Sequence, residues 1–301
     1  EIIEVGGKTY RRDPDVFDTW FSSSSWPYVT FGYPGEYFKK FFPVSLMETG
    51  GEILYPWVSR MIMLGLYVTG EIPFEAVYIH GYVMAEDGSK MSKSKGNTVD
   101  LSEVIDQYGS DALRMGIISG RSPAVNRGYD RRRVEKARNF CNKLWNVARF
   151  VEDTVGDDYH LRHSAKPETE ADHWILTKLQ RSADRIAEDL ENYRFAEAYE
   201  MLFHTLWDDF ADWYIEASKA KPNHSVLAHG LDTLLKLAHP FAPFVTETIW
   251  QTLKWEEGLL ATSSWPRVEA GDKRAADEFR AIRKLVKEIR SITRKLRLSK
   301  P

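Results

Sequence analysis

An α/β segment followed by an all-α segment is the architecture expected of these 301 residues. Before residue 120, short apolar runs such as Glu75–His80 are typical of strands, and glycines and prolines separate them. From Arg131 onward, apolar residues recur at three- and four-residue steps, which indicates amphipathic helices. Because 43% of the residues are hydrophobic, the chain can form more than one core.

Two helices are expected within the α/β part. Segment 55–68 has apolar residues at helical spacing. A second helix is predicted over residues 101–115, where Asp100 or Ser102 can cap the first turn. This helix directly follows a loop that is rich in lysine.

The all-α part is expected to form a helical bundle. Its helices are predicted near residues 134–154, 171–191, 194–219 and 226–253. Pro240 and Pro243 should break or kink the last of them, because proline removes a backbone donor and clashes with the preceding turn. A final helix is predicted over residues 277–298. Its apolar residues have the a/d spacing of a short coiled coil, and they are Ile282, Leu285, Ile289, Ile292 and Leu296.

Composition limits the classes of function. The net charge is only -3, so any binding of nucleic acid must come from local basic patches. The single cysteine, Cys141, excludes an intramolecular disulfide and a cysteine-based zinc site, which favours a reducing, cytoplasmic compartment. With one cysteine, we also expect no metal cluster. Charges or prolines interrupt every apolar stretch before 18 residues, so we expect no membrane segment.

The run Asp87–Asn97 carries the clearest chemistry. Lys90 and Lys93 can place positive charge on phosphate oxygens, while Ser92 and Ser94 can donate hydrogen bonds to them. Glycines bound the run and allow the loop to move. This pattern is typical of a site for a triphosphate.

The ordered string Lys90-Met91-Ser92-Lys93-Ser94 resembles the second signature of class I aminoacyl-tRNA synthetases. The string Asp15–Ser23 is similar to one found in the valyl-tRNA synthetases of that class. Isoleucyl relatives tend to carry an acidic residue after the Trp-Phe pair, whereas four serines, Ser22–Ser25, follow Phe21 here. The isoleucine enzyme remains the alternative within the class.

The resemblance implies an adenylate site and an aliphatic pocket. In the family, the segment that matches Thr49–Trp57 supports the adenylate, and His-Gly after the next strand contacts ATP. Glu52 stands where the family usually has Asp, so the charge is kept one methylene further out. The implied contacts to ATP, which enters with Mg²⁺, come from Gly50, Glu52, His80, Gly81, Met91, Ser92 and Ser94, with Lys90 and Lys93 as catalytic residues. Trp20 and Trp57 are implied as the walls of the valine pocket.

A basic stretch follows the α/β part. Between Arg121 and Lys143 there are eight Lys or Arg residues and two acids, a density suited to phosphate contacts. The next residues resemble the first helix of the anticodon-binding domain in the valine, isoleucine, leucine and methionine enzymes. Leu144, Trp145 and Val147 are expected to face the bundle. The residues predicted to contact tRNA are Arg131, Arg132, Arg138, Asn142, Lys143, Asn146, Arg149 and Phe150.

The first signature of class I enzymes, His-x-Gly-His, does not occur in the sequence. We therefore expect a C-terminal fragment that lacks the N-terminal catalytic half and the editing domain, and that makes no aminoacyl-adenylate alone. A non-catalytic tRNA-binding module is the alternative from another functional class, although a pure RNA binder has no use for the lysine loop.

The expected organisation has three parts. Residues 1–120 form the second half of a Rossmann-like catalytic domain, residues 121–270 form a stem-contact segment and anticodon-binding bundle, and residues 271–301 begin a coiled-coil arm. The expected function is that of a valine–tRNA ligase, a monomer that activates valine with ATP and transfers it to tRNA(Val).

Overall fold

The computed structural model describes residues 2–156, 159 and 165–296. The chain forms two compact units. Unit 1 contains the residues up to Tyr82 together with Pro123–Arg127. Unit 2 contains Val83–Ser122 and the residues from Gly128 onward. Each unit is described by itself below.

Unit 1 is built around one parallel strand pair with its crossover helix. Strands β3 (Val44–Gly50) and β4 (Phe74–His80) pair in parallel, with Val44 opposite Phe74 and Gly50 opposite His80. Helix α3 (Ser59–Thr69) connects them, as a parallel pair requires. The predicted strand at residues 75–80 and the predicted helix at 55–68 are confirmed, and the first turn of that helix, η2 (Leu54–Val58), is π-helical.

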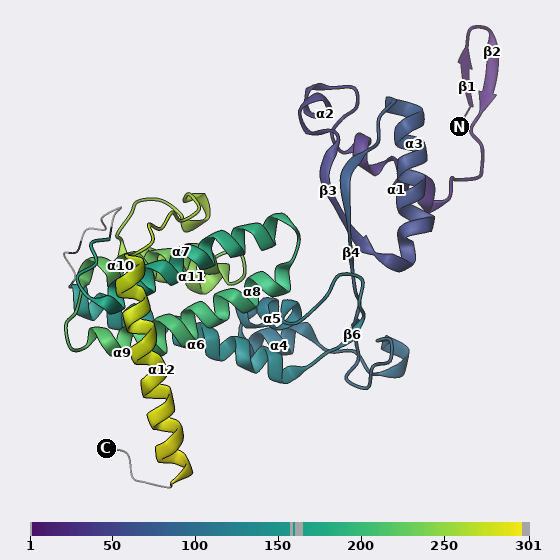
Figure 1. The fold of residues 1–301 in the computed structure, drawn as a ribbon. Helices are drawn as coiled ribbons and strands as arrows, with labels where there is room; N and C mark the ends of the chain where they lie inside the picture. Colours follow the sequence, from purple (N-terminus) through teal and green to yellow (C-terminus); the bar gives the residue numbers. More distant parts are fainter. Residues whose placement is uncertain (1, 157–158, 160–164, 297–301) are drawn as a thin grey trace. The chain divides into compact units, whose positions relative to one another are not determined.

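Two further helices and a hairpin complete unit 1, and the hairpin stands apart from the β3–β4 pair (Figure 1). Helix α1 (Thr19–Val29) packs on α3, and α2 (Glu36–Phe41) precedes β3. Strands β1 (Ile2–Val5) and β2 (Lys8–Arg11) form an antiparallel hairpin. A small core of Met47, Val58, Met61 and Phe74 joins the strands to α3.

Unit 2 begins with the lysine loop and two short helices. Strand β5 (Val83–Met84) precedes the loop, and the Met84 carbonyl accepts a hydrogen bond from the Tyr129 amide next to β6 (Arg127–Gly128). The loop contains the 3-10 turn η3 (Lys93–Lys95). Helices α4 (Leu101–Tyr108) and α5 (Ser110–Ile118) follow.

The prediction of one continuous helix over residues 101–115 is wrong. Gly109 has φ 88° and ψ 153°, so the chain turns there and starts α5 in a new direction. Only glycine adopts this conformation readily, and the apolar spacing on either side hid the break. The predicted cap is confirmed, since the Asp100 carboxylate accepts a hydrogen bond from the Ser102 amide at 2.8 Å.

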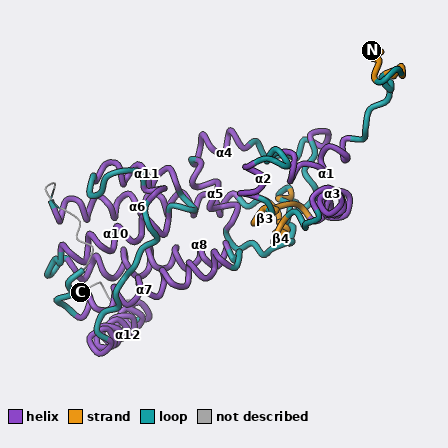
Figure 2. The backbone as a smooth tube through the Cα atoms, turned by 90° about the horizontal axis from the view of Figure 1, so that it is seen from above, coloured by secondary structure: helices purple, strands orange, loops and turns teal. Residues whose placement is uncertain are grey.

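Unit 2 continues as a bundle whose long helices α6, α7, α8 and α10 run side by side (Figure 2). Its elements are α6 (Arg131–Val155), α7 (Glu170–Glu191), α8 (Phe195–His204), the π-helical η4 (Thr205–Tyr214), α9 (Ile215–Ser218), α10 (His224–Ala238), α11 (Pro243–Leu253), η5 (Leu260–Thr262) and α12 (Lys273–Lys295). The helices predicted near 134–154, 171–191 and 194–219 are confirmed. The chain leaves the helix between α10 and α11, as Pro240 and Pro243 predicted.

The bundle core is continuous with α5. Phe140 and Leu144 of α6, Trp174 of α7, and Phe210 of η4 are almost fully buried in one cluster. Helices α6 and α7 of this core begin at side-chain caps. Asp130 caps α6, and Thr169 forms a capping box with Asp172 at the start of α7.

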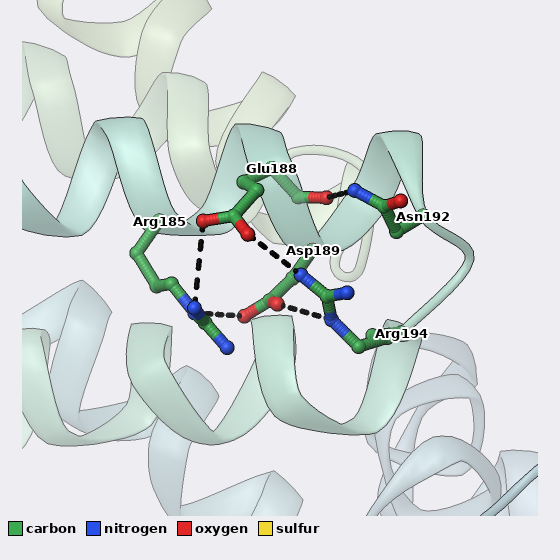
Figure 3. A network of polar contacts seen from close by, with 5 residues as sticks. All are labelled: Arg185, Glu188, Asp189, Asn192 and Arg194. Carbon is green, nitrogen blue, oxygen red and sulfur yellow. Dashed lines mark hydrogen bonds and ion pairs between the residues drawn. The ribbon is translucent and has the colours of Figure 1, made fainter.

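A network of charges fixes the turn between α7 and α8 (Figure 3). The Asp189 carboxylate is only 1% exposed, and it lies 3.0 Å from Arg185 Nε and 2.7 Å from Arg194 Nε. Glu188 contacts the same two guanidinium groups from the outside. Because a buried carboxylate is stable only when it is paired, these two arginines allow the turn to pack tightly.

The predicted final helix is present as α12, which packs on α7 and buries Ala276 and Phe279 in the bundle core. The predicted a/d residues face away from the bundle, and Ile282, Leu285, Ile289 and Ile292 are each 50–57% exposed. Among the described residues, no helix has the length and apolar character needed to cross a membrane.

Candidate nucleotide and RNA sites

The first group of candidate residues lies where β3 and β4 end. Gly50 and His80 are register partners at the carboxyl ends of these parallel strands, and Gly81 follows His80. Ligands of open α/β sheets bind beyond this edge. The structure of unit 1 therefore brings three of the predicted ATP contacts together.

Gly50 and Gly81 both lie where another part of the chain comes very close to their backbone. A Cβ atom on Gly50 would overlap the Tyr82 hydroxyl, and one on Gly81 would overlap the Val125 carbonyl oxygen. Backbone cannot move aside as a flexible side chain can. Gly81 is thus required by the packing of segment Pro123–Arg127, in addition to the expected room for a planar ligand.

His80 is held by neighbours on both sides. Its Nε2 atom lies 3.4 Å from the Glu48 carboxylate, and its ring meets the Tyr82 ring edge to face at 5.6 Å. Glu52 follows β3 in the 3-10 turn η1 (Gly51–Ile53), where its side chain is exposed. A carboxylate and an imidazole at a strand edge can orient a ribose or an ammonium group by hydrogen bonding.

The two tryptophans predicted to line the valine pocket come from elements that contact each other. Trp20 lies in the first turn of α1, whose cap Asp18 accepts a hydrogen bond from the Trp20 amide at 2.8 Å. Trp57 lies in η2, and its indole Nε1 donates to the Ser23 carbonyl of α1 at 3.1 Å. This bond fixes one indole against the helix that carries the other. Both rings are half-buried, as the walls of an apolar pocket would be.

The lysine loop belongs to unit 2 and is held by its own polar groups. The Ser89 amide donates to Asp87 at 2.9 Å, and the hydrogen bonds from Ser89 hold the pKa of that carboxyl below its usual value. The hydroxyls of Ser92 and Ser94 lie 2.7 Å apart, and Met91 is half-buried. Lys90 and Lys93 are exposed, so their ammonium groups can reach a ligand.

Asn97 organises this loop, a role that was not predicted from the sequence. Its side-chain oxygen accepts a hydrogen bond from the Ser92 amide at 2.8 Å, while its amide nitrogen donates to Ser89 Oγ at 2.9 Å and to the Lys90 carbonyl at 3.2 Å. A single side chain thus ties the first half of the signature to the residue that precedes it. Asn following Gly96, which has φ 64°, was the available indication, since such pairs stabilise turns.

The predicted tRNA-binding residues of α6 fall into two groups. Asn142, Asn146 and Arg149 are exposed, and Arg132 is 88% exposed beside Asp130. These four can present amide and guanidinium donors to RNA. The structure brings them together on a single helix.

The other predicted residues of α6 already contact protein. Arg131 donates to the Tyr108 hydroxyl and, at 2.9 Å, to Gln107, so it joins α6 to α4. The Arg138 guanidinium lies over the Tyr108 ring. Lys143 pairs with Asp212 at 2.9 Å and lies over the Trp207 ring.

Two aromatic residues of α6 differ from expectation in their surroundings. The Phe150 ring is half-buried and packs against the bundle core, so only part of it is open for stacking. Trp145 is 39% exposed, and the prediction that it faces the bundle is wrong. The helical spacing of Leu144 and Val147 defines the buried face, and Trp145 lies about 100° from Leu144 around the helix.

The described residues contain no group of three or more His, Cys, Asp or Glu side chains arranged for a metal ion. Burial raises the pKa of the Cys141 thiol to about 12, so this thiol is not a nucleophile at neutral pH. The candidate nucleotide site and the candidate RNA site both support the binding of phosphate groups by cationic side chains and amides.

Comparison with known families agrees with this chemistry. Residues 1–127 match the family described as tRNA synthetases class I (I, L, M and V), and residues 172–301 match the anticodon-binding domain of tRNA ligases. The chain belongs to the class I tRNA synthetases. Its fold is accordingly part of the Rossmann-like catalytic domain of these synthetases followed by their helical anticodon-binding domain, as predicted.

The curated relatives of this synthetase chain are valine–tRNA ligases. It is 42% identical to the valine–tRNA ligase of Geobacillus kaustophilus and 40% identical to that of Bacillus subtilis, over 95% of the chain and 34% of each relative. The identity to the Staphylococcus aureus enzyme is 43% over 87% of the chain and 32% of the relative. The chain spans about a third of the length of the relatives that it matches.

Solved structures of class I synthetases share the fold. A leucyl-tRNA synthetase of Agrobacterium radiobacter, in a ternary complex with tRNA and LeuAMS, superposes with a TM-score of 0.77 at 23% identity, over 91% of this chain and 36% of that one. Methionyl-tRNA synthetase of Mycobacterium tuberculosis, in complex with methionyl-adenylate, gives 0.64 at 19% identity, over 84% and 54%.

Proposed function

We propose that this chain is the part of a valine–tRNA ligase that carries the lysine loop, one edge of the adenylate site and the tRNA-binding bundle. The observation that carries the proposal is identity of about 40% to valine–tRNA ligases over 95% of the chain. The same relatives favour valine over isoleucine, as do the four serines Ser22–Ser25. The parent enzyme activates valine with ATP and transfers it to tRNA(Val).

The lysine loop serves the first of these steps. Attack of the valine carboxylate on the α-phosphorus of ATP forms valyl-adenylate and releases pyrophosphate, so negative charge grows on the leaving phosphates. Lys90 and Lys93 stabilise that charge, and Ser92 and Ser94 donate hydrogen bonds to it. Mg²⁺ enters with ATP, whose phosphates supply its oxygen ligands, since no cluster of metal-ligating side chains occurs in the described chain.

The residues at the carboxyl ends of β3 and β4, together with the two tryptophans, would bind the nucleotide and the amino acid. Gly50, His80 and Gly81 line the edge at which adenine and ribose would bind, and Glu52 supplies a carboxylate for the ribose or for the valine ammonium group. Trp20 and Trp57 form walls for the isopropyl group. Such a pocket distinguishes side chains by roughly 1–3 kcal/mol per methylene, so near-isosteres of valine would require editing elsewhere in the parent enzyme.

The bundle serves the tRNA. Exposed Asn142, Asn146 and Arg149 on α6 offer donors to unpaired bases and phosphates of the anticodon arm, and Arg132 extends this face toward the stem. Arg131, Arg138 and Lys143 support the face through their protein contacts. We propose a cytoplasmic monomer, because the machinery of protein synthesis is cytoplasmic and each proposed site is built from a single chain.

The proposal is tested by binding of tRNA(Val) to the purified chain. We expect binding that is tighter for tRNA(Val) than for a non-cognate tRNA, and a loss of affinity of about tenfold for Arg149→Glu, with the salt slope reduced by about 1. Arg181→Glu, an exposed position on α7, is the matched control and should bind as the wild type does. Equal binding of all tRNAs would instead favour the alternative, a general RNA-binding module.

A further inference from the structure

A groove runs along the bundle of unit 2. It has a volume of about 640 Å³ and lies between α7, η4 and α12. Lys178 comes from α7, Asp208 and Asp209 come from η4, and the opposite wall is the segment Arg280–Ser291 of α12. The predicted tRNA contacts of α6 do not include any of these residues.

The acidic floor of the groove is neutralised from within. Asp209 is only 9% exposed, and it lies 3.0 Å from Lys178 Nζ and 3.2 Å from Arg283 Nη2. The Arg283 guanidinium also lies over the rings of Trp174 and Trp213, at 4.1 and 4.8 Å from their centroids. Two cations therefore share one buried carboxylate, and the floor has no net attraction for a further cation.

The side of the groove that α12 forms carries further positive charge. Arg280, Lys284 and Lys287 are spaced four and three residues apart, which places them on the side of the helix that lines the groove. All three are exposed, and they span about 10 Å of helix axis at a rise of about 1.5 Å per residue. Glu288 is the acid on this wall. A row of this length matches a chain of several phosphates better than one small anion.

The groove continues toward the basic end of α6. His204 lines both this groove and a second cavity of about 400 Å³, whose walls include Arg132, Arg133 and Lys136. All of these residues belong to unit 2. The two cavities therefore meet at His204 on α8, with Asp130 and Glu200 among the lining residues of the second, and Arg132 in that second cavity is already a predicted tRNA contact.

We propose that this α7–η4–α12 groove binds the phosphodiester backbone of RNA, as a second contact for the RNA that α6 holds; the inference rests on the proposed tRNA-binding function. The groove binds backbone and not bases, because Arg283, Lys287 and Arg290 lie over the Trp213 ring and cover the aromatic face on which a base would stack. Contacts of this kind are independent of sequence and strongly dependent on salt.

The test is the salt dependence of tRNA binding by the 301-residue chain. The groove variant carries Lys284→Glu and Lys287→Glu, and a milder variant carries Lys284→Gln and Lys287→Gln. The control carries Lys273→Glu and Arg274→Glu, which change the same charge on exposed positions of α12 outside the groove. Circular dichroism and thermal midpoints establish that each variant is folded.

We expect the groove variant to bind tRNA(Val) and a non-cognate tRNA about tenfold or more weakly, by the same factor for both. The slope of log affinity against log salt concentration should decrease in magnitude by about 1 for each lysine that is replaced. The Gln variant should show a smaller loss in the same direction, and the control should bind as the wild type does. Inorganic phosphate at the same ionic strength should not compete, which separates an RNA groove from a site for a small anion.

Four outcomes would overturn the inference. If Arg149→Glu weakens binding and the groove variant does not, α6 alone holds the RNA, and the proposed function stands without the groove. If the control loses as much affinity as the groove variant, the change in net charge causes the loss, and the position of the lysines in the groove does not matter. Competition by phosphate alone would make the groove an anion site. Absence of any tRNA binding by the wild type would contradict the proposed function as well.

Discussion

At the scale of single residues, the lysine loop depends on a side chain that carries no charge. Asn97 holds the Ser92 amide, the Ser89 hydroxyl and the Lys90 carbonyl in fixed positions. The two lysines can stabilise a transition state only if the loop holds them in place before reaction, since reorganisation would otherwise offset their electrostatic contribution. Asn97 therefore fixes the backbone on either side of Lys90, whose catalytic role is proposed above.

Replacing this residue should release the loop. Asn97→Ala removes three hydrogen bonds worth about 1 kcal/mol each, so the open form of the loop should be populated at least tenfold more. Trypsin cleavage after Lys90, Lys93 or Lys95 would then be faster by a similar factor, as followed by mass spectrometry under native conditions. Thr98→Ala is the exposed control. Equal cleavage rates for the two variants would show that Asn97 does not hold the loop.

Two histidines of unit 2, the buried His229 and the half-buried His239, give the bundle a pH dependence. Burial lowers the pKa of His229 on α10, with the nearby Lys236 acting in the same direction, and burial also lowers the pKa of His239. Above about pH 6.5 these imidazoles are neutral in both folded and unfolded chains. Below it the unfolded chain takes up protons first, so the free energy of unfolding falls as pH falls toward the lower pKa of the folded state.

Urea unfolding at pH 7.5 and pH 5.5 measures this effect. The wild type should be less stable at pH 5.5, and His229→Gln should lose less stability between the two pH values than the wild type does. His224→Gln changes an exposed histidine at the start of the same helix and should leave the difference unaltered. An unchanged difference in His229→Gln would mean that other groups cause the acid sensitivity.

Single residues also show what the sequence could and could not predict. Lys90 and Lys93 are exposed on a loop as expected, because the string that contains them is local. The protein contacts of Arg131 and Lys143 could not be predicted, because their partners Tyr108 and Asp212 lie 23 and 69 residues away. A basic run indicates charge, and tertiary contacts decide which of those charges remain available to a ligand.

At the scale of elements, the break at Gly109 allows α5 to join the bundle. The Asp111 carboxylate at the start of α5 accepts hydrogen bonds from the Phe244 and Val245 amides, at 3.2 and 2.7 Å. These amides lie in the first turn of α11, whose N-terminal end favours negative charge. Arg114 adds hydrogen bonds to the carbonyls of Pro240 and Phe241.

Removing this inter-helix cap should destabilise unit 2. Asp111 is 6% exposed, so Asp111→Ala leaves two helix amides without an acceptor and should cost about 2–3 kcal/mol of unfolding free energy. Chemical denaturation measures it. Asp106→Ala on α4 removes an exposed carboxylate and should change stability by less than about 0.5 kcal/mol. If Asp111→Ala changes stability by a similarly small amount, water replaces the carboxylate as the hydrogen-bond acceptor of the two amides.

The elements themselves were largely predictable. Long amphipathic helices have a strong period, so α6, α7 and α12 appear close to their expected bounds. The exceptions are backbone events that periodicity does not record. Gly109 turns the chain without interrupting the apolar spacing, and the π-helical stretch Thr205–Tyr214 keeps a helical pattern while changing its hydrogen bonding.

At the scale of the whole molecule, the nearly neutral net charge hides a strongly uneven distribution. The chain has 41 Lys or Arg and 44 Asp or Glu residues, yet α6 and α12 carry rows of exposed cations. A few of the acids serve the interior of the bundle, where Asp172, Asp189 and Asp209 are each buried beside their partners. The local rows of cations on α6 and α12, and not the net charge, therefore define the surface that RNA would meet.

Helix α6 sets a fixed interval inside unit 2. Arg131 at its start is bonded to α4, the helix that follows the lysine loop, and Arg149 lies near its other end. The 18 steps between them amount to about 27 Å of axis at about 1.5 Å each, with each step turning the helix by about 100°. The number of residues between Arg131 and Arg149 thus sets both the distance to the proposed RNA-binding residues and the direction in which they point. One inserted residue would aim Asn146 and Arg149 at a different side of the bundle, whereas seven would nearly restore their direction at a longer reach.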